Sequence, residues 1–135
     1  MSWQRETQAR LQRLVRQLCT AHEVEHRHLV EYRGWAYIDG GKRIVAGPRI
    51  RGYVSFAYFA HELAHHLLGH DLGNTTPADE LSAWGYARQL FREHGVKWSN
   101  GVSAVARDTL ANVLKKANVT DPKLKAIRLL ENAGL

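Results

Sequence analysis

The sequence holds a single cysteine and three prolines, and no apolar run approaches the roughly 18 residues that a membrane-spanning helix requires. One cysteine cannot close an internal disulfide. Cys19 falls in the apolar stripe of a helical pattern, which predicts a buried structural thiol rather than a nucleophile. The charged N-terminus, MSWQRETQARLQRLVRQ, lacks the apolar centre of a signal peptide. These absences predict a reducing, cytoplasmic setting and no membrane.

Acidic residues are outnumbered by basic ones, 13 against 19, which gives a net charge of +6. A basic surface can attract nucleic acid or acidic partners. No known nucleic-acid motif accompanies the charge, so a solvated surface is the favoured interpretation, with a nucleic-acid partner as the alternative. Nothing in the sequence indicates an oligomeric state.

The length of 135 residues, 44% of them hydrophobic, predicts one globular domain over residues 1–135. Ser55 and Thr76 are expected as helix N-caps, and DGGK is expected as a hairpin turn. The expected elements are a helix, three strands and four helices, over residues 3–20, 28–32, 34–38, 43–47, 55–69, 77–94, 103–117 and 121–132. This order predicts an α+β fold, with a small antiparallel sheet of about three strands packed against helices.

The stretch YFAHELAHHLLGH, residues 58–70, contains His61, Glu62 and His65 in the pattern HExxH. Residues i and i+4 of a helix lie about 40° apart, so the imidazoles of His61 and His65 can face one point. Two histidines at this spacing are typical zinc ligands, and Glu62 beside them can act as general base on a zinc-bound water. The motif predicts one catalytic zinc per chain, and the alternative is an ordinary histidine-rich amphipathic helix.

A catalytic zinc needs a third protein ligand. On this helix, His66 and His70 point away from the metal, because they lie about 140° and 180° from His61. In the next helix, Glu80 lies at the centre of an apolar face, and a buried carboxylate is costly unless it is paired or bound to metal.

Glu80 is therefore the expected third ligand, and Ser82 is expected on the opposite, outward side of that helix. Asp79, at the edge of the apolar face, is the alternative ligand. A first-turn acid favoured by the helix dipole is the other explanation for Glu80.

Tyr58 lies one helical turn before Glu62 on the metal side and is a candidate catalytic residue that stabilises the oxyanion. Plain aromatic packing of Tyr58 is the favoured alternative, and Tyr86 and His66 are further candidates for this role. Strand 43–47 is expected beside the cleft, where it could pair with an extended substrate.

The chain resembles the ImmA/IrrE-type zinc metallopeptidases. Their sheet leads through an arginine-containing turn into a helix of the form F-x-x-A-H-E-L-x-H, followed by a helix of the form E-x-E-A-x-x-F-A. The matching text is RIVAGPRIRGYVSFAYFAHELAHHLLGH and then ELSAWGYA, within roughly residues 28–94. Ser82 stands where the family has its second glutamate, and Glu80 matches the first.

The resemblance implies a zincin-like fold and a cytosolic bacterial, plasmid or phage protease that cleaves a repressor or another regulator. It also implies a minimal version, without the family's helix-turn-helix and sensor-like domains. The sequence as a whole thus predicts a zinc endopeptidase acting on a protein substrate. The alternatives are a DNA-associated zinc protease and a non-catalytic, metal-stabilised regulatory or nucleic-acid-binding module.

Overall fold

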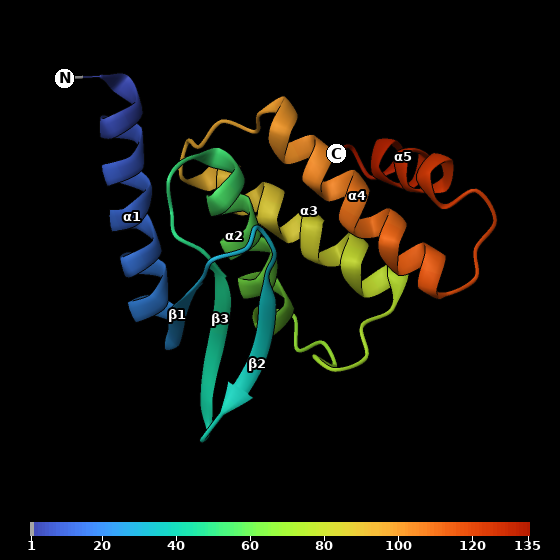
Figure 1. Ribbon diagram of the computed structural model, residues 1–135, viewed down its shortest axis with the longest axis horizontal. Helices are drawn as coiled ribbons and strands as arrows, with labels where there is room; N and C mark the ends of the chain where they lie inside the picture. Colours follow the sequence, from blue (N-terminus) through green and yellow to red (C-terminus); the bar gives the residue numbers. More distant parts are fainter. Residues whose placement is uncertain (1) are drawn as a thin grey trace.

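The computed structural model describes residues 2–135, in which five helices and three strands form an α+β fold, as the sequence predicts (Figure 1). The elements are α1 Trp3–His22, β1 Val24–Leu29, β2 Trp35–Asp39, β3 Lys42–Pro48, α2 Tyr53–Leu67, α3 Pro77–Glu93, α4 Asn100–Lys116 and α5 Pro122–Asn132. Helix α1 stands on one side of the molecule and α3, α4 and α5 on the other, with α2 between them above the sheet (Figure 1).

The sheet has the order β1-β3-β2 and is mixed, because β3 pairs in parallel with β1 and antiparallel with β2. The expected β2–β3 hairpin is confirmed: Gly40 and Gly41 both have positive φ, which the tight turn requires. The expectation of a purely antiparallel sheet is wrong, and so is a first strand at 28–32. Glu23 ends α1 in the left-handed conformation, with φ of 54°, and β1 begins at the very next residue.

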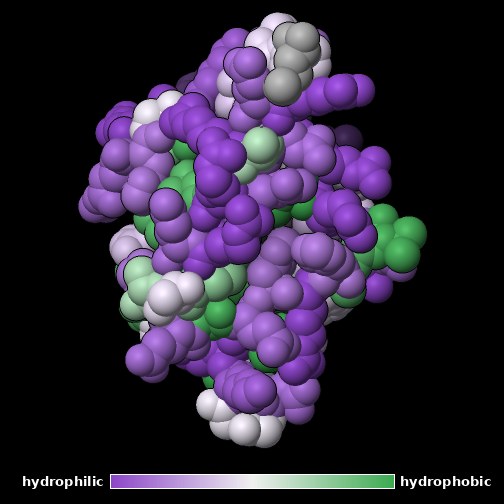
Figure 2. All heavy atoms as spheres, turned by 90° about the vertical axis from the view of Figure 1, so that its left-hand side faces the viewer, coloured by the Kyte–Doolittle hydropathy of each residue, from purple (hydrophilic) through white to green (hydrophobic). Residues whose placement is uncertain are grey.

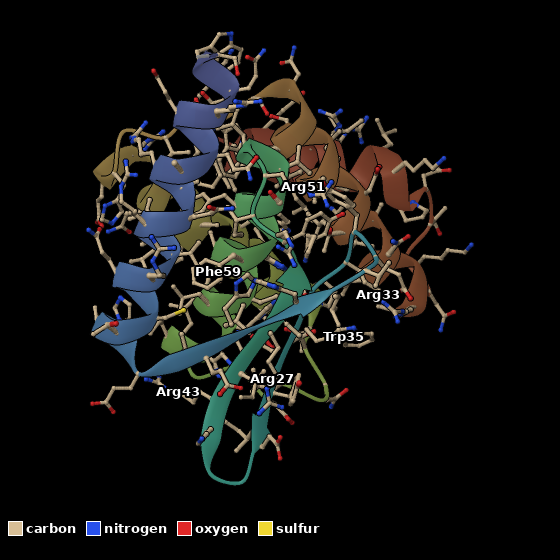
Figure 3. All side chains as sticks on the ribbon, turned by 60° about the vertical axis from the view of Figure 1, so that its left-hand side comes forward. Arg27, Arg33, Trp35, Arg43, Arg51 and Phe59 are labelled. Carbon is tan, nitrogen blue, oxygen red and sulfur yellow. The ribbon has the colours of Figure 1, made fainter. Side chains whose placement is uncertain are left out.

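Strand β1 has the polar sequence VEHRHL, and its two faces lie in different surroundings. His26 points toward the helices and lies edge-on to Phe59 of α2, with ring centroids 5.2 Å apart. Arg27 points the other way and forms ion pairs with Glu25 and Asp39. Figure 3 labels Phe59 on α2 and Arg27 over the strands of the sheet. Residues 24–29 therefore lack the simple apolar alternation by which a strand is recognised in a sequence.

Two helix starts show how local sequence sets the helices that carry the site. Helix α3 begins as predicted, with Thr76 as N-cap and Pro77 in the first turn. Helix α2 begins earlier than predicted, at Tyr53 after Gly52. Ser55 is not its N-cap but lies in its first turn, where the hydroxyl accepts hydrogen bonds from the N–H groups of Arg51 (2.8 Å) and Gly52 (3.1 Å).

Apolar side chains from every helix and from β1 and β3 form one buried cluster. Its largest fully buried side chains include Trp84, Phe56, Phe59 and Phe91, and the rings of Phe56 and Phe91 are 5.1 Å apart. Since α2 runs through this cluster, the buried polar side chains on α2 pack against close neighbours that restrict their movement. Such a helix can present ligands rigidly.

The surface is more polar than this core. The face that includes α1 is mostly hydrophilic, with hydrophobic residues in separate patches (Figure 2). Cys19 lies half-buried against the core, and its burial raises the pKa of the thiol to about 11. Cys19 is thus protonated at neutral pH, which agrees with the predicted structural role. Within residues 2–135, every helix is too short or too polar to cross a membrane.

Candidate metal centre

Helix α2 presents His61 and His65 toward the same point from within the core. Both side chains are 3% exposed, and their ring centroids are 4.6 Å apart. One helical turn separates the two residues, as the spacing of the motif predicts. The ring of His61 also stacks on the indole of Trp84 in α3, at 4.3 Å and 12°. The first histidine is therefore held between its own helix and the next.

Helix α3 supplies a carboxylate to the same point through Glu80, which is 6% exposed. One carboxylate oxygen lies 2.7 Å from Nε2 of His61, and the other lies 3.3 Å from Nε2 of His65. The hydroxyl of Thr75 donates a hydrogen bond to Glu80 at 3.0 Å. One ligand atom from each of His61, His65 and Glu80 lies within 4.8 Å of the others, so this buried group could hold a metal ion.

The start of α3 fixes the position of Glu80. The Thr76 hydroxyl accepts from the Asp79 N–H, and the Asp79 carboxylate accepts from the Thr76 N–H, both at 3.1 Å. This reciprocal cap locks the first turn of the helix, which carries Glu80. Asp79 is outside the converging group, and Ser82 is exposed on the far side of the helix, as helical geometry predicts.

The charges in the centre depend on one another. Burial lowers the pKa of His61, but the charges and hydrogen bonds of Glu62 and Glu80 outweigh it and raise the pKa to about 9. Burial raises the pKa of Glu80, but hydrogen bonds from His61 and His65 outweigh that effect and hold the pKa below its ordinary value. Without a metal, a proton on His61 balances the charge of the buried Glu80 carboxylate. A divalent cation would neutralise it in the same place.

Glu62 lies beside this group without belonging to it. Its carboxylate is 3.0 Å from Nδ1 of His61, the ring nitrogen that faces away from Glu80. The loop between β1 and β2 passes close to Glu62 at Gly34, where an added Cβ would lie only 2.7 Å from Glu62 Cγ. A glycine is needed at residue 34 because any larger residue would displace the Glu62 side chain.

A cleft of about 470 Å³ opens onto His61 and Glu62. The β1–β2 loop and the start of β2 form one wall, and α4 forms the other. Tyr58 also lines the cleft, and its ring lies edge-on to Tyr32 at 6.2 Å. Burial, followed by the charge of Asp108 and by Tyr32, raises the pKa of Tyr58, which keeps its hydroxyl protonated and able to donate a hydrogen bond.

The structure separates the other oxyanion candidates from the cleft. His66 is buried, and its Nε2 donates a hydrogen bond to the backbone carbonyl of Ile44 at 2.7 Å, so it ties α2 to β3. Tyr86 packs against the hydrophobic core and is not among the residues that line the cleft. Of the three candidates, Tyr58 alone lines the cleft beside Glu62.

His70 is outside the group of converging ligand atoms, as predicted, but its ring turns back toward His65, which a continuous helix would not allow. Helix α2 ends at Leu67, and Gly69 turns the chain with a φ of 69°. Nδ1 of His70 thereby lies 2.8 Å from Nδ1 of His65, and Nε2 of His70 lies 3.7 Å from Asp79. The glycine followed by histidine was the sequence signal for this return, since glycine commonly ends a helix in the left-handed conformation.

The expected pairing of strand 43–47 with an extended substrate is wrong, because β3 is the central strand and is already paired on both sides. The strand with a free edge near the site is β2. A groove of about 790 Å³ separates Trp35–Ile38 of β2 from residues 70–73. Trp35 lines both this groove and the cleft over Glu62, so the two are neighbours.

Comparisons of the chain with protein-family models, with curated proteins and with solved structures found no match. The candidate site therefore stands on its own geometry.

Proposed function

We propose that this chain is a zinc-dependent endopeptidase in which His61, His65 and Glu80 bind one zinc ion. The observation that carries the proposal is the convergence of Glu80 on the two histidines, of which His61 lines an open cleft together with Glu62. Two imidazole nitrogens and one carboxylate oxygen are a donor set typical of catalytic zinc, which keeps a fourth position for water or substrate. All three side chains are buried, which suits a tightly held ion.

A zinc ion in this site would lower the pKa of a bound water to about 7 and polarise the carbonyl of a peptide bond. Glu62 would accept the proton of that water and donate it to the leaving amine. Gly34 would leave room for the Glu62 side chain, which an added Cβ would displace. Tyr58 would donate a hydrogen bond to the oxyanion that forms on the carbonyl.

The groove along β2 would hold the peptide in an extended conformation. A free strand edge offers unpaired N–H and C=O groups, to which a peptide can add as a further strand. The resemblance to ImmA/IrrE-type peptidases extends the proposal to the substrate, which would be a protein such as a repressor or another regulator. The mixed three-stranded sheet and the HExxH helix are compatible with that family, and this assignment is part of the proposal.

Glu62→Gln tests the proposal because it removes the base and leaves the three ligands in place. We expect the variant to bind zinc with unchanged stoichiometry and to leave intact every protein that the wild-type chain cleaves. Cleaved proteins can be found by comparing the peptide termini generated in cells that express either form. Ser82→Ala is the matched control on the exposed side of α3 and should cleave as the wild type does.

The same comparison separates the proposal from a metal-stabilised module without turnover. Zinc bound equally by both forms, with no terminus that depends on Glu62, would contradict the peptidase and leave the module. Nucleic-acid binding measured at low salt tests whether the basic surface recruits DNA. Such binding should weaken steeply as salt is added.

A further inference from the structure

A line of contacts leads from the candidate metal centre to a second carboxylate behind it. Nε2 of His65 faces Glu80, and Nδ1 of His65 lies 2.8 Å from Nδ1 of His70. Nε2 of His70 lies 3.7 Å from a carboxylate oxygen of Asp79. The side chain of His70 is only 11% exposed, so this arrangement lies largely beneath the surface. None of the proposed chemical steps uses His70 or Asp79.

We propose that His70 is a positioning residue that fixes the ring and the tautomer of His65 for metal binding. The inference rests on the proposed function only in that it requires a metal at the three converging ligand atoms. It does not require that the chain cleave peptides.

The positions of the protons follow from the contacts. A neutral imidazole carries one N–H, and a histidine ligand needs a free lone pair on the nitrogen that meets the metal. With Nε2 of His65 toward the metal, its proton lies on Nδ1. The 2.8 Å contact then makes Nδ1 of His70 the acceptor, so the proton of His70 lies on Nε2, which faces Asp79.

Hydrogen bonds that involve the backbone hold His70 and Asp79 in place independently of a metal. The N–H of His70 donates to the carbonyl of His65 at 3.1 Å after the turn at Gly69. Asp79 is held by its reciprocal cap with Thr76. The outer partners are thus in place before the ion arrives, which lowers the cost of ordering the ligand.

The two ligand histidines differ in their outer partners. Nδ1 of His61 faces Glu62, which has a part in the proposed reaction, whereas Nδ1 of His65 faces His70, which has none. Removing His70 should therefore weaken metal binding without removing a reacting group. Loss of an outer partner typically costs about 10- to 100-fold in metal affinity.

The test measures zinc affinity by competition with a chromophoric chelator, in a Glu62→Gln background that prevents self-cleavage. His70→Leu removes the acceptor and should weaken zinc binding about 10- to 100-fold. His70→Asn keeps an acceptor oxygen near the position of Nδ1 and should stay within about threefold of the parent. His94→Leu, at the opposite end of α3 from Glu80, is the control and should have no effect.

A second readout is the long-range ¹H–¹⁵N spectrum of the zinc-loaded parent, which does not depend on the folding of a His70 variant. We expect His65 to carry its proton on Nδ1, in a hydrogen bond, and His70 to carry its proton on Nε2. The opposite tautomer of His65 would overturn the inference. So would equal affinity in His70→Leu and the parent, or equal weakening by His70→Leu and His70→Asn, since the latter would indicate a general disturbance of the loop.

The outcomes for the two proposals are distinct. A parent chain that binds no zinc would overturn both. A chain that binds zinc with the expected His70 effects, but cleaves nothing in a Glu62-dependent way, would overturn the peptidase and leave the positioning role of His70 standing.

Discussion

The two sides of the candidate site differ in how firmly the fold holds them. On the metal side, His61, His65 and Glu80 are each less than a tenth exposed and belong to helices that cross the core. On the substrate side, the β1–β2 loop and β2 are open to solvent, with Trp35 51% and Ile38 56% exposed.

Under the proposed function, this difference suits the two sides to separate physical tasks. Metal ligands must stay within a few tenths of an ångström of one geometry, which close packing provides. A surface that receives different peptides needs unpaired edges and exposed side chains instead. The comparison predicts that substitutions on the metal side abolish binding of the ion, while those on the substrate side change the use of substrate and leave the ion bound.

The largest effect is expected for Glu80→Ala. Removing one of three ligands should weaken zinc binding by more than about 100-fold, because even the loss of an outer partner costs up to that much. The zinc-linked part of the stability should disappear as well, since metal binding is coupled to folding. Thermal unfolding with and without zinc measures this, with Ser82→Ala as the control. A Glu80→Ala chain still stabilised by zinc would place the third ligand elsewhere.

A large effect confined to the reaction is expected for Gly34→Ala. The new Cβ would lie 2.7 Å from Glu62 Cγ and force that side chain to move. We expect kcat to fall about 10- to 100-fold, as a displacement of about 1 Å in a catalytic group can cost, while the three ligands stay in place and the chain still binds one zinc ion. Gly85→Ala is the matched control, because its added Cβ has no atom within 4 Å. Equal rates for the two variants would show that the position of Glu62 does not depend on the space left by Gly34.

A moderate effect of pH is expected on the metal-free chain. The folded-state pKa of His61, about 9, lies above its ordinary value of about 6.5. The protonated ring therefore stabilises the fold fully below about pH 6.5, and that contribution is lost as the pH rises through 9. Because zinc binding requires neutral histidines, the zinc-loaded chain should lack this loss. The free energy of unfolding by denaturant is measured for both forms at several pH values. If it depends on pH in the same way in both forms, the coupling of His61 to Glu80 is contradicted.

The smallest effect is expected for Trp35→Ala on the substrate side. Trp35 lies between the cleft and the β2 groove and packs under the guanidinium of Arg33, at 5.2 Å. Its loss should raise KM about 3- to 10-fold for a protein substrate, with kcat and zinc affinity nearly unchanged. Trp3→Ala, on the exposed start of α1, is the control. A change in zinc affinity rather than KM would break the division between the two sides.

The metal side could be predicted from the sequence because it follows local rules. The spacing of His61 and His65 depends only on helical pitch, and Thr76 and Pro77 mark the start of α3 by their chemistry. Glu80 is predictable because a carboxylate centred on an apolar helical face needs a partner. Each inference required one helix and no knowledge of tertiary structure.

The substrate side could not be predicted in the same way, because pairing between distant segments decides it. Residues 24–29 pair in parallel with β3, and no property of VEHRHL indicates that partner. The free edge therefore falls on β2 instead of β3. The predicted orientation of His70 was wrong for a local reason. The helix ends before Gly69, and helical angles no longer apply beyond that point.

The central claim is that His61, His65 and Glu80 together bind one zinc ion, and anomalous diffraction at the zinc absorption edge tests it most directly. Crystals of the chain prepared with zinc should show one strong peak per chain, bounded by Nε2 of both histidines and a carboxylate oxygen of Glu80, about 2.0–2.2 Å from each. No peak at this point after saturation with zinc would contradict the account. A peak bound by the histidines while the Glu80 side chain turns to solvent would also contradict it.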